Sequence, residues 1–305
     1  MSLTVVGSIA FDSVQTPFGE RERMLGGSAV HFALAASFFT EVNVVGPVGD
    51  DFGPEQLEVL SARAIDTSDI EHVTGGQTFF WRGHYDHDMN VAHTDETQLN
   101  VFAEFEPKLS AASCESQMLF LGNIQPDLQR RVRGQSSASF SGLDSMNLWI
   151  DTARDSLVAA IGEIDCLLLN DAELRMLTSE PNLVHAARAT MAMGPSVVVA
   201  KRGEYGAVLF TEDGFFAIPG LPLEEVRDPT GAGDSFAGGF LGYLDAVRVA
   251  GDHDDGALRR AMAYGSVMAS FNVEDFGTAR VAALGEAEIA ERLALFKRLT
   301  HFEAS

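Results

Sequence analysis

The chain has 305 residues, of which 46% are hydrophobic, and its 21 Lys and Arg residues stand against 44 Asp and Glu residues, a formal net charge of −23. Such an acidic chain argues against binding to nucleic acid or to an anionic membrane, because both attract basic proteins. The sequence has no signal-peptide pattern and no apolar stretch of membrane-spanning length, and its two cysteines, Cys114 and Cys166, lie far apart. These features predict a cytoplasmic protein whose core needs neither a disulfide nor a metal ion.

Two strand–helix pairs are predicted near the beginning of the chain. Residues 3–7 form a short β-type run that ends at a glycine, and residues 26–39 have the small and apolar residues of a packed helix. A strand and a turn are predicted over 41–53, and the helix predicted over 54–63 begins with Pro54, which is favoured in a first turn. This alternation predicts a parallel sheet covered by helices.

The same rhythm resumes in four later stretches, and the last third of the chain is predicted to be mostly helical. The four stretches are 116–124, 143–151, 164–174 and 195–210. No linker-like segment separates them, so the sequence predicts a single domain over 1–305.

Residues 76–102 interrupt the alternation with two β-like stretches around a polar turn. We predict an antiparallel hairpin inserted into the α/β domain, where it is a candidate lid. On one strand of this hairpin His84, Asp86 and Asp88 would share a face. That pattern fits either a metal site or the solvated hairpin of an acidic protein, and the second is the simpler reading.

The densest glycine cluster is DPTGAGDSFAGGF, residues 228–240, directly before an apolar run that is predicted to be helical from about Ser235. The first amides of a helix have no partner inside the helix, and the helix dipole adds about half a positive charge there. Gly231, Ala232 and Gly233 have small side chains, so their N–H groups can approach an anion closely. This is one way for an acidic protein to hold a phosphate group.

Two well-known phosphate-binding patterns do not fit this cluster. A P-loop needs a lysine that is missing here, and the dinucleotide fingerprint needs a glycine where the chain has Phe236. Asp234 stands at the edge of the cluster, where a carboxylate would repel a bound phosphate. It suits a general base that takes the proton of a hydroxyl attacking that phosphate. The alternative is a carboxylate that only caps the helix.

With these residues in view, the cluster resembles the second signature of the ribokinase-like (PfkB-type) carbohydrate kinases. Four other motifs of that family have counterparts in the same order along the chain, and residues 142–152 fit the strand that usually precedes the Asn-x-x-Glu motif. The counterparts are GSIAFD for the opening strand end, GGSAVHFALAAS with GPVGDDFG for the first signature, LNDAE for Asn-x-x-Glu, and KRGEYG for the Gly-x-x-Gly turn.

The resemblance implies an α/β three-layer ribokinase-like fold, with a mostly parallel central sheet flanked by helices and a small antiparallel β lid. The lid would span approximately 72–105 together with approximately 13–25. The implied function is an ATP-dependent phosphotransferase that moves the γ-phosphate of MgATP to an alcohol group of a small, ribose- or fructose-like sugar. A nucleoside (adenosine-like) kinase and a non-catalytic sugar- or nucleotide-binding member are the alternatives, and an ADP donor is left open.

By the same resemblance, Asp234 is the base, and the amides of Gly231, Ala232 and Gly233 hold the transferred phosphoryl group. Asn170 and Glu173 would organise Mg²⁺ through water, without a direct metal ligand, although NDAEL also fits a helix cap. Residues implied on the nucleotide and magnesium side are Asn170, Glu173, Gly203, Gly206, Asp228 and Gly277.

The loop at Asp228 lies beside a monovalent-cation site in some relatives, so activation by K⁺ is a further implication. Lys201 and Arg202 fit either a phosphate contact or a solvated pair. The partners implied are a small sugar or nucleoside and a second copy of the chain paired through the lid.

On the acceptor side the resemblance implies Asp12, Gly26, Gly27 and His31. Asp12 would hold substrate hydroxyls, and the two glycines would let the acceptor approach the backbone. His31 departs from the family pattern, which usually has asparagine there, so it fits either a substrate contact or a packed histidine.

Overall fold

The predicted strands pair in one nine-stranded sheet in the computed structural model, which describes residues 2–249 and 255–301. The strand order is β13-β12-β11-β10-β9-β8-β1-β4-β5, and only the pairs that involve β12 are antiparallel. The strands of this sheet are β1 (Leu3–Val6), β4 (Val42–Val48), β5 (Ile70–His72), β8 (Met118–Leu121), β9 (Phe140–Asp144), β10 (Cys166–Asn170), β11 (Val197–Lys201), β12 (Ala207–Thr211) and β13 (Gly214–Ile218).

Helices lie on both faces of this sheet. The α-helices are α1 (Ser28–Ala36), α2 (Pro54–Ser61), α3 (Ala111–Cys114), α4 (Pro126–Arg133), α5 (Asn147–Thr152), α6 (Arg154–Ile161), α7 (Asp171–Thr178), α8 (Leu183–Met191), α9 (Ala232–Val249), α10 (Asp255–Asn272), α11 (Ala279–Ala282) and α12 (Glu286–Thr300). Two short 3₁₀ helices, η1 (Asn100–Glu104) and η2 (Gly203–Tyr205), lie in the connections.

Successive residues of the parallel strands point to opposite faces, and both faces are buried. Val5 and Leu168 join the core beneath α1, α9 and α10, whereas Val6 and Leu169 join the core beneath α4, α6, α7 and α8. The apolar runs of β1 and β10 follow from this, because a strand with helices on both sides has no solvent-facing side. The three-layer α/β architecture expected from the sequence is confirmed.

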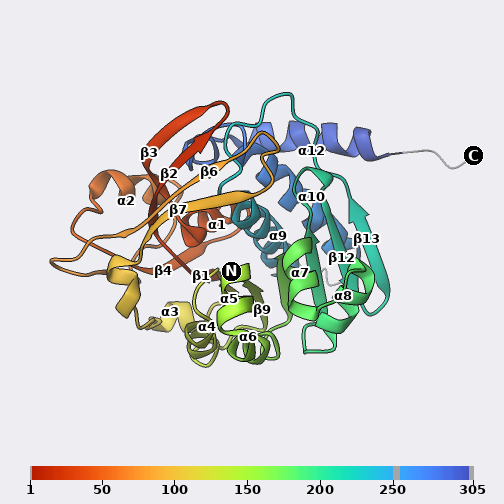
Figure 1. Cartoon of the computed structure of the whole chain (residues 1–305), viewed down its shortest axis with the longest axis horizontal. Coiled ribbons are helices and arrows are strands. Elements are labelled where there is room, and N and C mark those ends of the chain that lie inside the picture. The colour runs from red at the N-terminus through yellow and green to blue at the C-terminus, as the bar shows by residue number, and fades with distance from the viewer. Residues whose placement is uncertain (1, 250–254, 302–305) are drawn as a thin grey trace, which may run out of the picture.

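A second, four-stranded sheet lies beside the first, at the upper left of Figure 1. Its order is β3-β2-β6-β7, with β2 (Ala10–Thr16), β3 (Gly19–Gly26), β6 (Phe79–Tyr85) and β7 (Ala92–Gln98). The hairpin predicted within 76–102 is present as β6 and β7, and β2 pairs antiparallel with β3 but parallel with β6. We call these four strands the lid sheet.

Two boundaries differ from the sequence prediction. The stretch predicted as a strand over 142–152 is a strand only to Asp144, and helix α5 begins at Asn147. In α5, Trp149 Nε1 donates to Asn123 Oδ1 at 3.0 Å. The strand directly before the Asn-x-x-Glu motif is therefore β10. Helix α9 begins at Ala232 rather than near Ser235, so the glycine-rich cluster forms its first turn.

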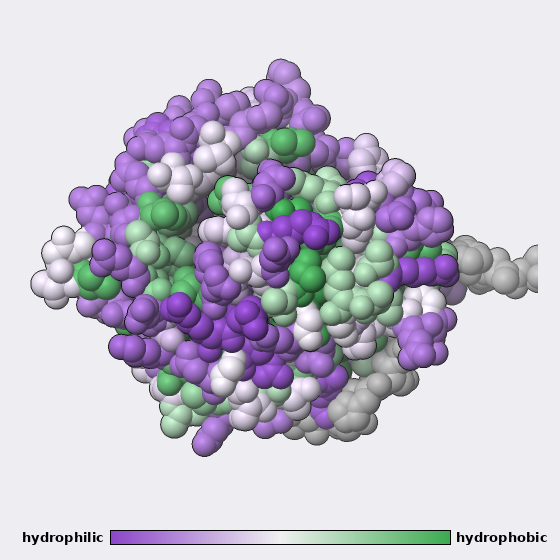
Figure 2. All heavy atoms as spheres, turned by 60° about the horizontal axis from the view of Figure 1, so that its bottom comes forward, coloured by the Kyte–Doolittle hydropathy of each residue, from purple (hydrophilic) through white to green (hydrophobic). Residues whose placement is uncertain are grey.

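Hydrophilic residues cover much of the face in Figure 2, with apolar residues in scattered patches. Among the helices of the described chain, none combines the length and the apolar character needed to cross a bilayer.

Candidate active site

Polar residues end three adjacent strands of the main sheet. Asp144 ends β9, Asn170 ends β10 and Lys201 ends β11, and these strands are parallel neighbours. In open α/β sheets, ligands bind beyond the carboxyl ends of the strands. The sheet therefore brings three polar side chains to the edge where a ligand is expected.

Lys201 and Asp144 form an ion pair at this edge. Their Nζ and Oδ2 atoms lie 2.7 Å apart, and the side chains are 16% and 7% exposed. The ammonium also lies beside the glycine-rich turn, because a Cβ on Gly233 would come within 3.0 Å of Nζ. Burial lowers the pKa of Lys201, but the carboxylates of Asp144 and Glu173 outweigh it and hold the pKa above its ordinary value. Lys201 is thus a permanent positive charge next to the turn.

The start of α9 leaves two amides for a ligand. Gly231 has a φ of 75°, and its carbonyl accepts the first hydrogen bond of the helix from the Ser235 N–H at 2.8 Å. The Ala232 N–H donates to the Pro229 carbonyl at 3.1 Å. The Thr230 N–H donates to Asp228 Oδ1 and the Asp234 N–H interacts with its own carboxyl group, so within the described turn the N–H groups of Gly231 and Gly233 are the donors without a partner. An anion at this helix start would meet them together with the helix dipole.

Asp234 lies in the first turn of α9 and is partly buried. Burial and the charge of Asp144 together raise its pKa to about 8, against the opposing charge of Lys201. A carboxyl group that gains and loses its proton near neutral pH is suited to general-base chemistry. The first turn of α9 thus places a titratable carboxyl group near the positive charge of Lys201 and the free amides.

Asp228 connects the glycine-rich turn to a distant segment. Its Oδ1 accepts from the Thr230 N–H at 2.9 Å, and its Oδ2 accepts from the Gly277 N–H at 3.0 Å. Burial raises the pKa of Asp228, and these hydrogen bonds oppose the rise. Gly277 has a φ of 62° and packs against Met24 of the lid sheet, where a Cβ would lie 3.1 Å from the Met24 Cβ. The structure thus brings Asp228 and Gly277 together.

Asn170 and Glu173 form a capping box at the start of α7. Asn170 Oδ1 accepts from the Glu173 N–H, and Glu173 Oε2 accepts from the Asn170 N–H, both at 2.8 Å. The helix cap that the sequence allowed is therefore formed, but Glu173 Oε1 takes no part in its hydrogen bonds. Burial raises the pKa of Glu173 to about 7, with the charge of Asp144 adding to the rise and that of Lys201 opposing it. The cap fixes both side chains beside the ion pair.

Asp12 lies in β2 and faces two consecutive glycines. Its Oδ2 accepts from the Gly27 N–H at 3.3 Å. A Cβ on Gly26 would overlap the Asp12 carboxylate, and Gly27, with a φ of 94°, has no room for a Cβ against the Ser8 carbonyl. Burial raises the pKa of Asp12 to about 7, and the hydrogen bond from Gly27 opposes that rise. Both positions require glycine, because the Asp12 carboxylate and the Ser8 backbone occupy the space that a larger side chain would need.

His31 lies behind the glycine-rich turn. Its Nδ1 lies 2.9 Å from Asn272 Oδ1, and because an amide oxygen only accepts, Nδ1 carries the proton. Its ring packs against Gly231, where a Cβ would overlap the imidazole. Burial lowers the pKa of His31 to about 4, so the ring is neutral. Nε2 is buried and has no hydrogen-bond partner among the described residues.

Gly203 and Gly206 form the turn between β11 and β12. Both have positive φ, 54° and 88°, and the Gly206 N–H donates to the Gly203 carbonyl at 3.0 Å. A Cβ on Gly206 would overlap the Ile218 carbonyl, which explains the glycine. Because Lys201 ends β11, this turn follows the ion pair directly.

The sequence reading missed Asp144 and treated Lys201 and Arg202 as one basic pair. The structure separates the pair, because Lys201 joins the site whereas the Arg202 guanidinium lies over the exposed Tyr205 ring at 6.0 Å. Asp144 had a usable signal, since it is a polar residue at the end of a buried β-run. The strand predicted over 142–152 concealed that signal by placing Asp144 inside the strand.

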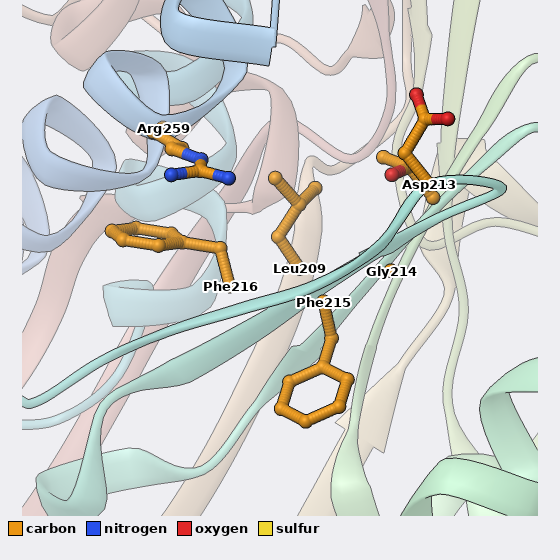
Figure 3. Close-up of a pocket in the computed structure, with 7 residues that line it drawn as sticks. Leu209, Asp213, Gly214, Phe215, Phe216 and Arg259 are labelled. Carbon is orange, nitrogen blue, oxygen red and sulfur yellow. The ribbon is translucent and has the colours of Figure 1, made fainter.

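Among the residues that the structure describes, the histidines of the lid hairpin form no metal site, and a pocket at the β12–β13 hairpin lies away from the candidate active site. His84 pairs with Asp95 at 2.9 Å and His93 with Asp86 at 3.3 Å, and no group of three potential ligands in the described chain is arranged to hold a metal ion. Figure 3 shows a pocket of about 60 Å³ at the β12–β13 hairpin, where Arg259 lies over Phe216. This pocket lies at the opposite end of β12 from the Gly203–Gly206 turn.

Comparison with known proteins agrees with this arrangement. The sequence profile of the pfkB family carbohydrate kinases matches residues 3–283. The chain belongs to this family. It is therefore a kinase of the ribokinase-like group, which transfers phosphoryl groups to sugars or nucleosides, and the use of ATP is expected for the family.

Two curated relatives are nucleoside-directed kinases. The chain is 29% identical to the cytidine kinase of Thermococcus kodakarensis over 251 residues, which are 80% of this chain and 88% of the relative. It is also 29% identical to the nucleoside kinase of Methanothermobacter thermautotrophicus over 296 residues, 90% of each chain. A solved structure of Burkholderia thailandensis nucleoside kinase in complex with inosine superposes with a TM-score of 0.80 over 98% of each chain at 21% identity. That likeness shows the shared fold.

Proposed function

We propose that this kinase transfers the γ-phosphoryl group of ATP to a hydroxyl group of a nucleoside, with Asp234 as the general base. The observation that carries the proposal is the first turn of α9, where Asp234 stands beside two free amides and the Lys201 ammonium. The two nucleoside-directed relatives favour a nucleoside over the free sugar expected from the sequence. A free sugar is the second candidate, because the family as a whole is described by its carbohydrate acceptors.

In the proposed reaction the ionised Asp234 accepts the proton of the acceptor hydroxyl as its oxygen attacks the γ-phosphorus. The new P–O bond forms while the bond to the departing ADP breaks. A positioned base of this kind contributes on the order of 10²–10⁴ in rate. The raised pKa of Asp234 makes its carboxylate a better proton acceptor than an ordinary aspartate.

The amides of Gly231 and Gly233 would bind the oxygens of the transferred phosphoryl group, and Lys201 would add a positive charge beside them. Donors aimed at charge that develops in a transition state are worth about 3–4 kcal/mol each by mutagenesis in other enzymes. Their loss would therefore slow the chemical step more than it weakens binding.

Asn170 and Glu173 fit a magnesium ion held through water, because Glu173 Oε1 lies outside the capping box and the carboxylate is already fixed in position. When bound, Mg²⁺ would neutralise part of the triphosphate charge. Each oxygen of Asp228 accepts one backbone hydrogen bond and keeps a further lone pair, so the carboxylate would still be able to contact a K⁺ ion. Activation by K⁺ therefore needs its own comparison of KCl with NaCl.

Asp12 would hold an acceptor hydroxyl beside Gly26 and Gly27. The lid sheet would cover the acceptor and exclude water, so that transfer to the acceptor outcompetes hydrolysis.

The test is ADP formation from MgATP across cytidine, inosine, adenosine, ribose and fructose, with the Asp234→Asn variant as a control. Turnover with a nucleoside that the variant loses supports the proposal. Turnover with ribose or fructose alone selects the sugar candidate. Tight binding of an acceptor without turnover by the wild type would instead indicate a non-catalytic family member, and replacing ATP by ADP tests the donor.

A further inference from the structure

Tyr85 joins the lid sheet to the glycine-rich turn. It is the last residue of β6, and its hydroxyl oxygen lies 3.2 Å from Thr230 Oγ1, although the two residues are 145 positions apart in the chain. Burial raises the pKa of the phenol, and the charges of Asp228 and Asp12 act in the same direction. The hydroxyl therefore keeps its proton and remains able to donate a hydrogen bond.

Thr230 is also held from the side of the core. Its N–H donates to Asp228 Oδ1 at 2.9 Å, and its carbonyl accepts from Asn272 Nδ2 at 2.7 Å. Asn272 is itself fixed, because its Oδ1 accepts from Ser235 Oγ and from His31 Nδ1, both at 2.9 Å. All three polar groups of Thr230 are thus bonded, two of them by buried side chains and one by the lid.

The lid hairpin touches the active site at a second point. Asn90 Nδ2 lies 3.4 Å from Glu204 Oε1, and a Cβ on Gly203 would come within 2.8 Å of Asn90 Oδ1. The turn of the hairpin therefore rests against the turn between β11 and β12. Because Tyr85 and Asn90 are close in sequence, one end of the hairpin contacts both loops of the site.

We propose that Tyr85 is a positioning residue that couples closure of the lid to the assembly of the anion-binding turn. The inference rests on the proposed kinase reaction. Thr230 directly precedes Gly231, so a hydrogen bond to its hydroxyl restrains the amides of Gly231 and Gly233. When the lid is open, the turn keeps only its bonds to the core. The phosphoryl-binding amides are then fully positioned only when the lid lies over an acceptor, which disfavours transfer to water.

The experiment compares the wild type with Tyr85→Phe, Thr230→Val and the double variant. Tyr264→Phe is the matched control, because it removes a phenol hydroxyl from a ring packed on Tyr243 and Phe39, at 4.4 and 5.1 Å, outside the site. Three quantities are measured: kcat for acceptor phosphorylation, the ratio of ATP hydrolysed to phosphoryl group transferred, and hydrogen exchange of the backbone amides in 228–236.

Tyr85→Phe is expected to lower kcat about 3- to 10-fold, the effect of losing one hydrogen bond. It should also raise the hydrolysis ratio and speed amide exchange in 228–236, with KM for MgATP within about 2-fold of the wild type. Thr230→Val should lower kcat at least as much, because it also removes the hydroxyl group that interacts with Asp228. The double variant should be no worse than Thr230→Val, since the bond between Tyr85 and Thr230 is already lost there. Tyr264→Phe should match the wild type.

Additive losses in the double variant, or a hydrolysis ratio and an amide exchange equal to those of the wild type, would overturn the inference. If the wild type transfers no phosphoryl group to any acceptor, the proposed function fails. In that case amide exchange still decides whether Tyr85 restrains the turn, because it needs no turnover. Faster exchange in Tyr85→Phe supports the restraint, and unchanged exchange refutes it.

Discussion

The proposed role of Asp234 as general base, beside the charged side chains of Asp144 and Lys201, predicts how the reaction rate depends on pH. Burial and the charge of Asp144 raise the pKa of Asp234 to about 8, and the charge of Lys201 opposes the rise. If the ionised carboxylate is the base, its fraction is about 1% at pH 6 and about 90% at pH 9. The rate at subsaturating concentrations of both substrates should therefore rise about 90-fold between these pH values and level off above about pH 9.

The two neighbours should move this midpoint in opposite directions. Asp144→Asn removes a negative charge near Asp234, so ionisation becomes easier and the midpoint falls. Lys201→Met removes a positive charge, so the midpoint rises. A change of about one pKa unit corresponds to about 1.4 kcal/mol, which is in the range expected for a nearby charge in a partly buried site.

The assay is ADP formation at subsaturating MgATP and acceptor from pH 6 to 9.5, in buffers of constant ionic strength. Lys201→Arg, which keeps the charge, is the control for Lys201→Met, and circular dichroism verifies that each variant is folded. A rate that does not change with pH, or midpoints that move in the same direction in both variants, would refute the assignment of Asp234 as the base tuned by this ion pair.

Three further outcomes are expected. Asp234→Asn should raise Tm at pH 8.5 by about 2 °C or more, the shift produced by about 1 kcal/mol in a domain of this size. The reason is that a carboxyl group with a raised pKa stabilises the fold fully only below about pH 4, and this contribution is lost as the pH rises through about 8. A lower Tm would contradict the argument that burial raises the pKa. In steady-state kinetics, Gly26→Ala should raise the KM for the acceptor about 10-fold or more and leave the KM for MgATP within about 2-fold of the wild type, because the new Cβ displaces the Asp12 carboxylate. Equal changes in the two KM values would argue against binding of the acceptor by Asp12. Gly231→Ala should lower the free energy of unfolding by about 1–2 kcal/mol, measured by denaturant unfolding, because of the positive φ at this position. It should also lower kcat at least about 10-fold, measured from initial rates, because the new Cβ overlaps the His31 ring. A variant with wild-type kcat would show that the turn tolerates displacement.

The sequence predicted the layers of the fold because local patterns determine them. Apolar runs such as β1 and β10 alternate with helices, and a parallel sheet buried on both faces requires runs of this kind. The hairpin of β6 and β7 was predictable for the same local reason. The glycine-rich turn also carried its own signal, since Gly231 needs its positive φ whatever lies around it.

The contacts that organise the site were not predictable, because they join distant segments. His31 meets Asn272 across 241 residues, and Tyr85 meets Thr230 across 145. No local pattern marks a tyrosine at the end of a lid strand as the partner of a threonine in a distant loop. The ion pair of Asp144 with Lys201 likewise depends on the order of β9, β10 and β11 in the sheet, which the linear sequence does not display.

The most direct test of the account is the rate of the first turnover with MgATP and the acceptor that the panel identifies. Wild type and Asp234→Asn are mixed with saturating substrates, and the phosphorylated acceptor is quantified in each. The account predicts a loss of about 10²–10⁴ in this rate with ATP binding retained. An Asp234→Asn variant that forms product at the wild-type rate would contradict the claim that Asp234 takes the proton.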